Sequence, residues 1–250
     1  MVETITLYTA KASPYAQRVE LALEESGAKY EKFEVDLHNK PEWYAPKVNP
    51  TGKVPAIAYG GPPVSPSQPS PESTKLAESL VLLEFVADLF PASHLLPKSP
   101  VQRAKARFFI DAVSTKFLPK FLGFVVRGEA EGGEALYNAI EELQALIEGK
   151  YALGDEWSSA DAAFTPFLAR LELSLRKDLG SFKEGEGTKL LGRLKEGTKF
   201  EVIWKYFENV TQRESFKKTF DEVRHPVAKL LLLSSRCSLF LAIGLFGLGL

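Results

Sequence analysis

Cysteine is almost missing from this chain of 250 residues, and so is net charge. The single cysteine, Cys237, excludes an intramolecular disulfide and makes a reducing compartment, the cytoplasm, the simplest setting. The three histidines, His38, His94 and His225, have no metal-ligand spacing with cysteine or with one another, so we expect no metal site. A formal net charge of -1 without a long basic run gives no indication of a nucleic-acid partner.

The chain also has little that could enter a membrane. Residues 239–250 are uncharged but too few to cross a bilayer, and extending the run back to Leu230 includes Arg236. For residues 226–250 we therefore expect a disordered or surface-packed tail rather than a membrane anchor. The role of this tail stays open. No apolar signal core follows the first methionine, so we expect no secretory leader.

The first third of the chain alternates strand and helix patterns. Residues 4–9 alternate in polarity and are rich in Thr, Ile and Tyr, which predicts a strand. Residues 15–26 place apolar side chains on one helical face, and Gly27 follows as a C-terminal stop. Residues 30–37 show period-two polarity again, so the segment predicts a βαβ unit with parallel strands.

Prolines mark the next segments. A short helix is expected to begin at Lys40-Pro41, and residues 49–53 have the composition of a turn. Residues 54–59 predict a strand whose second residue is proline, which is confined to edges, first positions or bulges of sheets. We predict that the Val54-Pro55 peptide bond is cis.

The rest of the chain predicts a loop and then helices only. Residues 60–75 are rich in Pro, Ser and Gly and predict a loop, and residues 76–90 predict a helix. We expect an α/β domain over residues 1–90, a linker over 91–100 and an all-α domain over 101–225. Within the second domain, helices are predicted from 104 to about 126 and over 134–148, 200–210 and 214–223, with a capping-box-like start at Ser158 to Asp161 and a loop or frayed helix over 180–198.

One short stretch suggests a binding site. Ser13 stands where the first helix is predicted to begin, and Pro14 suits the first helical turn because it has no N–H to leave unpaired. The free N–H groups and the positive dipole end of a helix favour a bound anion. Ser-Pro is also an ordinary way to start a helix, so this motif alone decides nothing.

Several motifs in order resemble the cytosolic glutathione transferases. The first half carries Ser13-Pro14-Tyr15, Asn49-Pro50, Val54-Pro55 and Glu78-Ser79 at the spacing of that family's thioredoxin-like domain. Gly154-Asp155 ahead of Ser158-Ser159-Ala160-Asp161 is similar to its helical domain. The segment Lys40-Pro41-Glu42-Trp43 most resembles the omega class, and serine before Pro14 resembles the fungal serine-type members. The resemblance implies a thioredoxin-like α/β domain followed by an all-α domain, and a homodimer.

The resemblance also implies glutathione as co-substrate and assigns roles to particular residues. Ser13 would donate a hydrogen bond to the glutathione thiolate, and a helix N-terminus lowers thiol pKa values. The backbone of Val54, before Pro55, would pair with the cysteinyl unit. Glu78 would bind the α-ammonium and Ser79 the carboxylate of the γ-glutamyl unit, while Lys40 would bind the glycyl carboxylate.

A hydrophobic second substrate would bind between the two domains. Tyr15, Phe121, Phe124 and Tyr137 are candidates for this wall, although such residues serve equally well as helix core. Because a hydroxyl does not undergo thiol–disulfide exchange, thioltransferase chemistry at position 13 is not expected. What remains is transfer of glutathione to aromatic electrophiles or peroxide reduction, and the alternative is a non-catalytic protein that sequesters aromatic or polyphenolic compounds.

Overall fold

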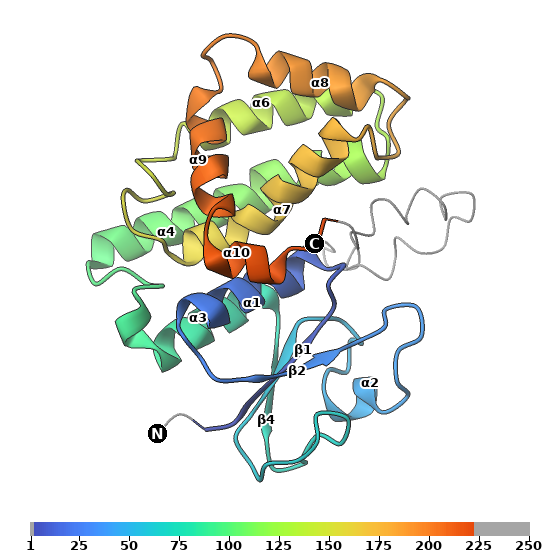
Figure 1. The fold of residues 1–250 in the computed structure, drawn as a ribbon, viewed down its shortest axis with the longest axis vertical. Coiled ribbons are helices and arrows are strands. Elements are labelled where there is room, and N and C mark those ends of the chain that lie inside the picture. Colours follow the sequence, from blue (N-terminus) through green and yellow to red (C-terminus); the bar gives the residue numbers. More distant parts are fainter. Residues whose placement is uncertain (1–2, 223–250) are drawn as a thin grey trace.

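A four-stranded sheet and a group of helices make up the two parts of the chain (Figure 1). The computed structural model describes residues 3–222, so Cys237 and the predicted tail over 226–250 lie outside the described residues. The sheet has the order β2-β1-β3-β4, in which β1 and β2 are parallel and the other pairs are antiparallel. The strands are β1 Ile5–Thr9, β2 Glu31–Glu34, β3 Ala56–Tyr59 and β4 Thr74–Ala77.

Helices cover both faces of this sheet. Ile5 and Leu7 of β1 belong to the main core together with residues of α1, Pro14–Glu25, and α3, Ser79–Leu89. Tyr8, the next residue along the strand, points to the opposite face because strand side chains alternate, and there it packs with Tyr44 of the short helix α2, Tyr44–Lys47. The predicted parallel βαβ unit is confirmed by β1, α1 and β2.

The regular elements of the second part are all helices within residues 100–222, as expected. A long helix begins at Pro100, and none of the helices within residues 3–222 is long and apolar enough to cross a membrane. Its members are α4 Pro100–Ala112, continued by the π-helical turn Val113–Phe117, α5 Leu118–Phe121 and the π-helical turn Leu122–Val126, then α6 Gly132–Gln144, α7 Ser159–Arg176, α8 Glu186–Lys195, α9 Glu201–Thr211 and α10 Glu214–Thr219.

Helix α7 is the centre of the helical part, and its start is the predicted capping box. The Ser158 hydroxyl accepts a bond from the Ala160 N–H at 3.3 Å, and the Asp161 carboxylate accepts one from the Ser158 N–H at 2.8 Å. Asp161 also accepts the Ala152 N–H at 2.8 Å, which ties the preceding loop to the helix. Most α7 side chains are buried, and α7 packs on α1 across the two parts.

Three predictions about elements were wrong. Residues 74–77 form strand β4 rather than loop and helix, because they pair with β3 from Tyr59↔Thr74 to Ala56↔Ala77. The short helix starts at Tyr44 rather than Pro41, whose carbonyl instead closes a turn with the Tyr44 N–H at 2.9 Å. Over residues 180–198, where a loop or a frayed helix was expected, the loop alternative was wrong, because residues 186–195 form a regular helix, α8, that buries Leu190 and Leu194.

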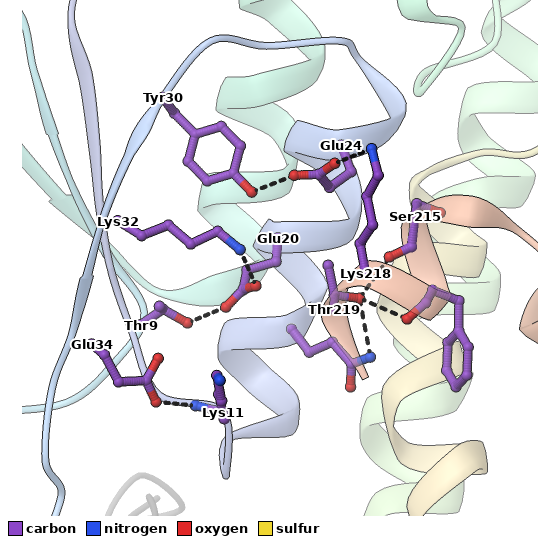
Figure 2. A network of polar contacts seen from close by, with 12 residues as sticks. Thr9, Lys11, Glu20, Glu24, Tyr30, Lys32, Glu34, Ser215, Lys218 and Thr219 are labelled. Atoms are coloured by element: carbon purple, nitrogen blue, oxygen red, sulfur yellow. Dashed lines mark hydrogen bonds and ion pairs between the residues drawn. The ribbon is translucent and has the colours of Figure 1, made fainter. Parts of the chain in front are cut away.

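Polar contacts fasten α10, the last helix described, to α1 (Figure 2). Lys218 reaches Glu24 at 3.3 Å, and the Gln17 amide donates to the Thr219 hydroxyl at 3.3 Å. Glu25 accepts a bidentate pair of bonds from Arg213 as well as the Ser215 hydroxyl. Helix α1 is therefore held by the sheet, by α7 and by the C-terminal end of the described chain.

Candidate functional site

Ser13 lies at the N-cap of α1, buried, with extended backbone angles. Its hydroxyl oxygen accepts the Ala16 N–H at 3.1 Å, and no residue within 3–222 accepts the proton of this hydroxyl. Pro14 has no N–H, so the Tyr15 N–H is the first free amide of the helix. An anionic sulfur placed here would meet an O–H donor, an N–H donor and the positive end of the helix dipole.

The second wall of the site is the segment that leads into β3. The Val54-Pro55 bond is cis, as predicted. Val54 makes no backbone hydrogen bond with any other described residue, whereas pairing of β3 with β1 begins at Ala56. The N–H and C=O of Val54 are therefore available to an extended peptide lying alongside.

The third wall is the start of α3. Glu78 is the N-cap residue and has a positive φ of 70°, a conformation that costs a non-glycine residue about 1–3 kcal/mol. Its exposed carboxylate forms no ion pair with residues 3–222. Ser79 is buried, and its hydroxyl accepts a hydrogen bond from Arg18. The free N–H groups at this helix start suit a carboxylate, and Glu78 stands where it can bind an ammonium group.

These three walls enclose one cavity of about 130 Å³. It brings together five of the predicted residues and Tyr15: the lining consists of Ala12, Ser13, Tyr15, Leu37, Asn49, Lys53, Val54, Pro55, Glu78 and Ser79. Lys40 is not in the lining, but its ammonium lies beside Gly52, 3.9 Å from where a β-carbon on that glycine would stand. The Lys40 ammonium thus lies beside the turn at residues 49–53, two residues of which, Asn49 and Lys53, line the cavity.

The predicted hydrophobic wall is only partly brought to this cavity. Tyr15 lines it and packs edge-on against Phe167 at 5.0 Å. Phe121 is buried and packs on Phe167, with their ring centres 6.2 Å apart. Phe124 lines a different cavity of about 850 Å³ between α6 and α8, and Tyr137 packs on Phe200 at 4.8 Å. The apolar stretch over residues 121–126 is mainly helix core, which was the other interpretation of its pattern.

The sequence patterns did not identify Asn49, Lys53 and Arg18 as residues of the site, although residues 49–53 were predicted to form a turn. Asn49 is buried and shapes the turn: its amide donates to the Lys53 carbonyl at 2.8 Å, and its side-chain oxygen accepts the Thr51 N–H at 3.1 Å. An Asn-Pro-Thr-Gly run is a recognisable turn signal of this kind. Nothing in the local pattern around Arg18 indicated a buried cation.

Comparison with known proteins identifies the family. A model described as the N-terminal domain of glutathione S-transferase matches residues 7–94. A protein from Nicotiana tabacum described as a probable glutathione S-transferase is 32% identical over 182 residues, covering 72% of this chain and 73% of the relative. The chain belongs to the glutathione S-transferase family.

The solved structures most informative for this transferase come from Trametes versicolor. Glutathione transferase Omega 2C is 55% identical, with 93% of this chain and 99% of that chain covered and a TM-score of 0.86. Glutathione transferase Omega 2S in complex with 2,4-dihydroxybenzophenone is 45% identical, with 94% and 100% covered and a TM-score of 0.84. The predicted family, omega-class likeness and two-part fold are confirmed, and glutathione is the co-substrate of such enzymes.

Proposed function

We propose that this transferase activates glutathione through Ser13 and transfers its sulfur to aromatic electrophiles. The observation that carries the proposal is the Ser13 hydroxyl at the cavity: its oxygen is fixed by the Ala16 N–H, and its proton has no acceptor among residues 3–222. Glutathione would lie with its cysteinyl unit along Val54 and its γ-glutamyl end at Glu78 and Ser79. Lys40, whose ammonium lies beside Gly52, would receive the glycyl carboxylate.

The chemistry follows from which atom carries the negative charge. A serine hydroxyl does not ionise at neutral pH, so it donates a hydrogen bond and leaves the sulfur of glutathione as the nucleophile. Stabilising the thiolate lowers its pKa, and a deprotonated thiol is the reactive species. The thiolate would then attack the electrophilic carbon, forming the thioether bond while the leaving group departs with the electron pair. Peroxide reduction would begin from the same thiolate.

The second substrate is proposed to be a planar aromatic compound. Support comes from the edge-on rings of Tyr15 and Phe167 beside the cavity and from the benzophenone ligand of the 45% identical Trametes structure. Sequestration of such compounds without turnover is the competing function, and turnover measurements separate the two. We also propose a cytoplasmic homodimer, in which Val81 of α3 and Phe108 of α4, 56% and 60% exposed, would be covered.

The test compares wild type with Ser13→Ala in the conjugation of glutathione to an aromatic electrophile. Removing a charge-assisted hydrogen bond worth about 1.5–3 kcal/mol should lower kcat/KM about ten- to a hundredfold. Ser99→Ala is the matched control, because Ser99-Pro100 is also a Ser-Pro helix start but its hydroxyl makes no capping bond and lies away from the cavity. Equal activity of wild type and Ser13→Ala would contradict the proposal.

A further inference from the structure

A buried cation stands directly behind the predicted γ-glutamyl end of the site. Arg18 of α1 is 2% exposed, and its guanidinium lies 5.4 Å from the Tyr15 ring centre and 4.6 Å from that of Phe167. No carboxylate within residues 3–222 pairs with it. Burial lowers the pKa of Arg18 to about 10, so the group stays charged at neutral pH. A charge in such surroundings is costly unless an anion compensates it.

The hydrogen bonds of Arg18 show where its charge is directed. Its Nε donates to the Ala163 carbonyl of α7 at 2.8 Å, and its Nη1 donates to the Ser79 hydroxyl oxygen at 3.2 Å. Its Nη2 has no partner among the described residues. Because Ser79 accepts from the guanidinium, its own proton must point elsewhere, and no residue within 3–222 receives it. Ser79 lines the cavity at the first turn of α3.

We infer that Arg18 is a positioning residue that holds the Ser79 hydroxyl as a donor toward the α-carboxylate of the γ-glutamyl unit. The inference rests on the proposed binding of glutathione in this cavity. A hydroxyl that accepts from a cation becomes a stronger donor, and the low dielectric around Arg18 extends the attraction to the bound anion. Arg18 thus acts through Ser79. It supplies the positive charge that would otherwise be missing from the surroundings of the bound carboxylate.

The competing explanation is a purely structural one. Arg18 joins α1 to α7 through Ala163, so its removal could loosen the contact between the two parts of the protein. A loosened site would weaken every ligand that binds there. The positioning role instead affects only ligands that carry the γ-glutamyl carboxylate, and this difference decides the experiment.

The experiment measures the affinity of full-length protein for two ligands by calorimetry. One is glutathione, and the other is 4-aminobutyryl-cysteinylglycine, which lacks only the α-carboxylate of the γ-glutamyl unit. Wild type should bind glutathione at least about tenfold more tightly than the analogue. Arg18→Met and Ser79→Ala should each bring this ratio close to one by weakening glutathione alone. The double variant should lose no more, because the two residues act in one chain of bonds.

Controls keep each outcome decisive. Arg176→Met removes an exposed arginine from α7 and should leave the ratio unchanged. If Arg18→Met does not fold, Arg18→Gln takes its place, because its amide can still donate to the Ala163 carbonyl. Equal weakening of both ligands by the Arg18 variant, an unchanged ratio in Ser79→Ala, or a wild-type ratio near one would each overturn the inference.

Failure of the proposed function has a different signature. Conjugation that does not depend on Ser13 would contradict the thiolate mechanism and leave the ratio of affinities untouched, since that ratio reports binding alone. Absence of glutathione binding by wild type would remove both proposals together.

Discussion

The chemistry proposed for position 13 depends on a single atom, the oxygen of the Ser13 side chain. It accepts one hydrogen bond from the backbone and has one proton to give. The same environment would act differently on sulfur, because a helix N-terminus favours a thiolate and would ionise a protein thiol. On this proposal, the choice between transfer of glutathione and exchange of disulfides would be made at this residue rather than by the fold.

Ser13→Cys should give the protein a thioltransferase activity that wild type lacks. The new thiolate can attack a glutathionylated substrate, form a mixed disulfide with its glutathionyl group and release the substrate thiol. A second glutathione then attacks this mixed disulfide, which restores the protein thiol and releases glutathione disulfide. Reduction of a small mixed disulfide by glutathione measures the gain, with Ser99→Cys as the control for an added cysteine in a Ser-Pro helix start. No rise above wild type would show that position 13 does not present its side chain to the substrate.

At the scale of elements, the start of α7 combines a helix cap with a buried charge. Asp161 is completely buried, and its oxygens accept bonds from the N–H groups of Ala152 and Ser158 and from the Ser158 hydroxyl at 3.1 Å. Burial nevertheless raises the pKa of Asp161 from 3.8 to about 6, because the loss of water outweighs these bonds. The folded protein therefore binds a proton here that the unfolded chain has already released.

This difference predicts a fall in stability as the pH rises from about 4 to about 6. In that window the folded state binds more protons than the unfolded state at this position, so the slope of the unfolding free energy with pH is negative. The difference between a pKa of 3.8 and one of about 6 at Asp161 corresponds to a loss of about 3 kcal/mol in the free energy of unfolding across this window. Denaturant unfolding at several pH values should show that the stability advantage of wild type over Asp161→Asn shrinks through this window.

Asp155→Asn, an exposed aspartate that loses the same charge, is the control for the change in net charge. A stability difference between wild type and Asp161→Asn that stays constant from pH 4 to 6 would contradict the assignment.

The elements that sequence patterns predicted well are those with strong local signals. The βαβ unit and the Ser158 capping box both come from short patterns with a direct physical cause. The cis Val54-Pro55 bond was predicted correctly, but a Val-Pro pair does not by itself determine the isomer. Strand β4 could not be predicted because its four residues show no clear alternation, and only pairing with β3 makes them a strand. Helix α8 was obscured by glycine and charge, and burial of Leu190 stabilises it.

The site could be predicted only where its residues belong to motifs. Ser13, Val54 and Ser79 line one cavity although they come from three segments that are distant in sequence. They could be predicted together only because their motifs follow one another in the same order in a known family. The identical dipeptide at Ser99-Pro100 begins α4 without lining that cavity, so the motif alone was insufficient. Arg18 and the placement of Phe124 depend on how α1, α7 and α8 pack, which no local pattern encodes.

At the scale of the whole molecule, α1 joins the sheet domain to the helical domain. It contacts α3 on its own side and α7 and α10 on the other. The contacts with α10 centre on Glu25, whose carboxylate accepts both Arg213 and Ser215 and is largely buried. Arg213 also donates to the Tyr151 hydroxyl at 2.7 Å. This cluster fastens the end of the described chain to the helix that carries Ser13.

Glu25→Gln should lower the free energy of unfolding by about 1–3 kcal/mol, because it leaves a partly buried arginine without its charged partner. Glu201→Gln is the control, since it breaks an exposed pair with Lys205 on α9 and should cost less than about 1 kcal/mol. Chemical denaturation of both variants gives the comparison. A cost for Glu25→Gln no larger than that of the control would show that α10 is not held through this cluster.

The contact between α1 and α7 has a consequence for chain connectivity. Arg18 reaches Ala163, Arg170 reaches the Lys11 carbonyl at 3.3 Å, and Phe167 packs on Tyr15, all across the boundary that we propose at residues 91–100. These contacts do not require the peptide linkage between α3 and α4. Two polypeptides made separately, one ending and the other beginning within that segment, present complementary surfaces, and we expect them to reassemble on mixing and to recover glutathione-conjugating activity. Fragment complementation would then be a property of this fold, because its first helix packs against elements of both halves.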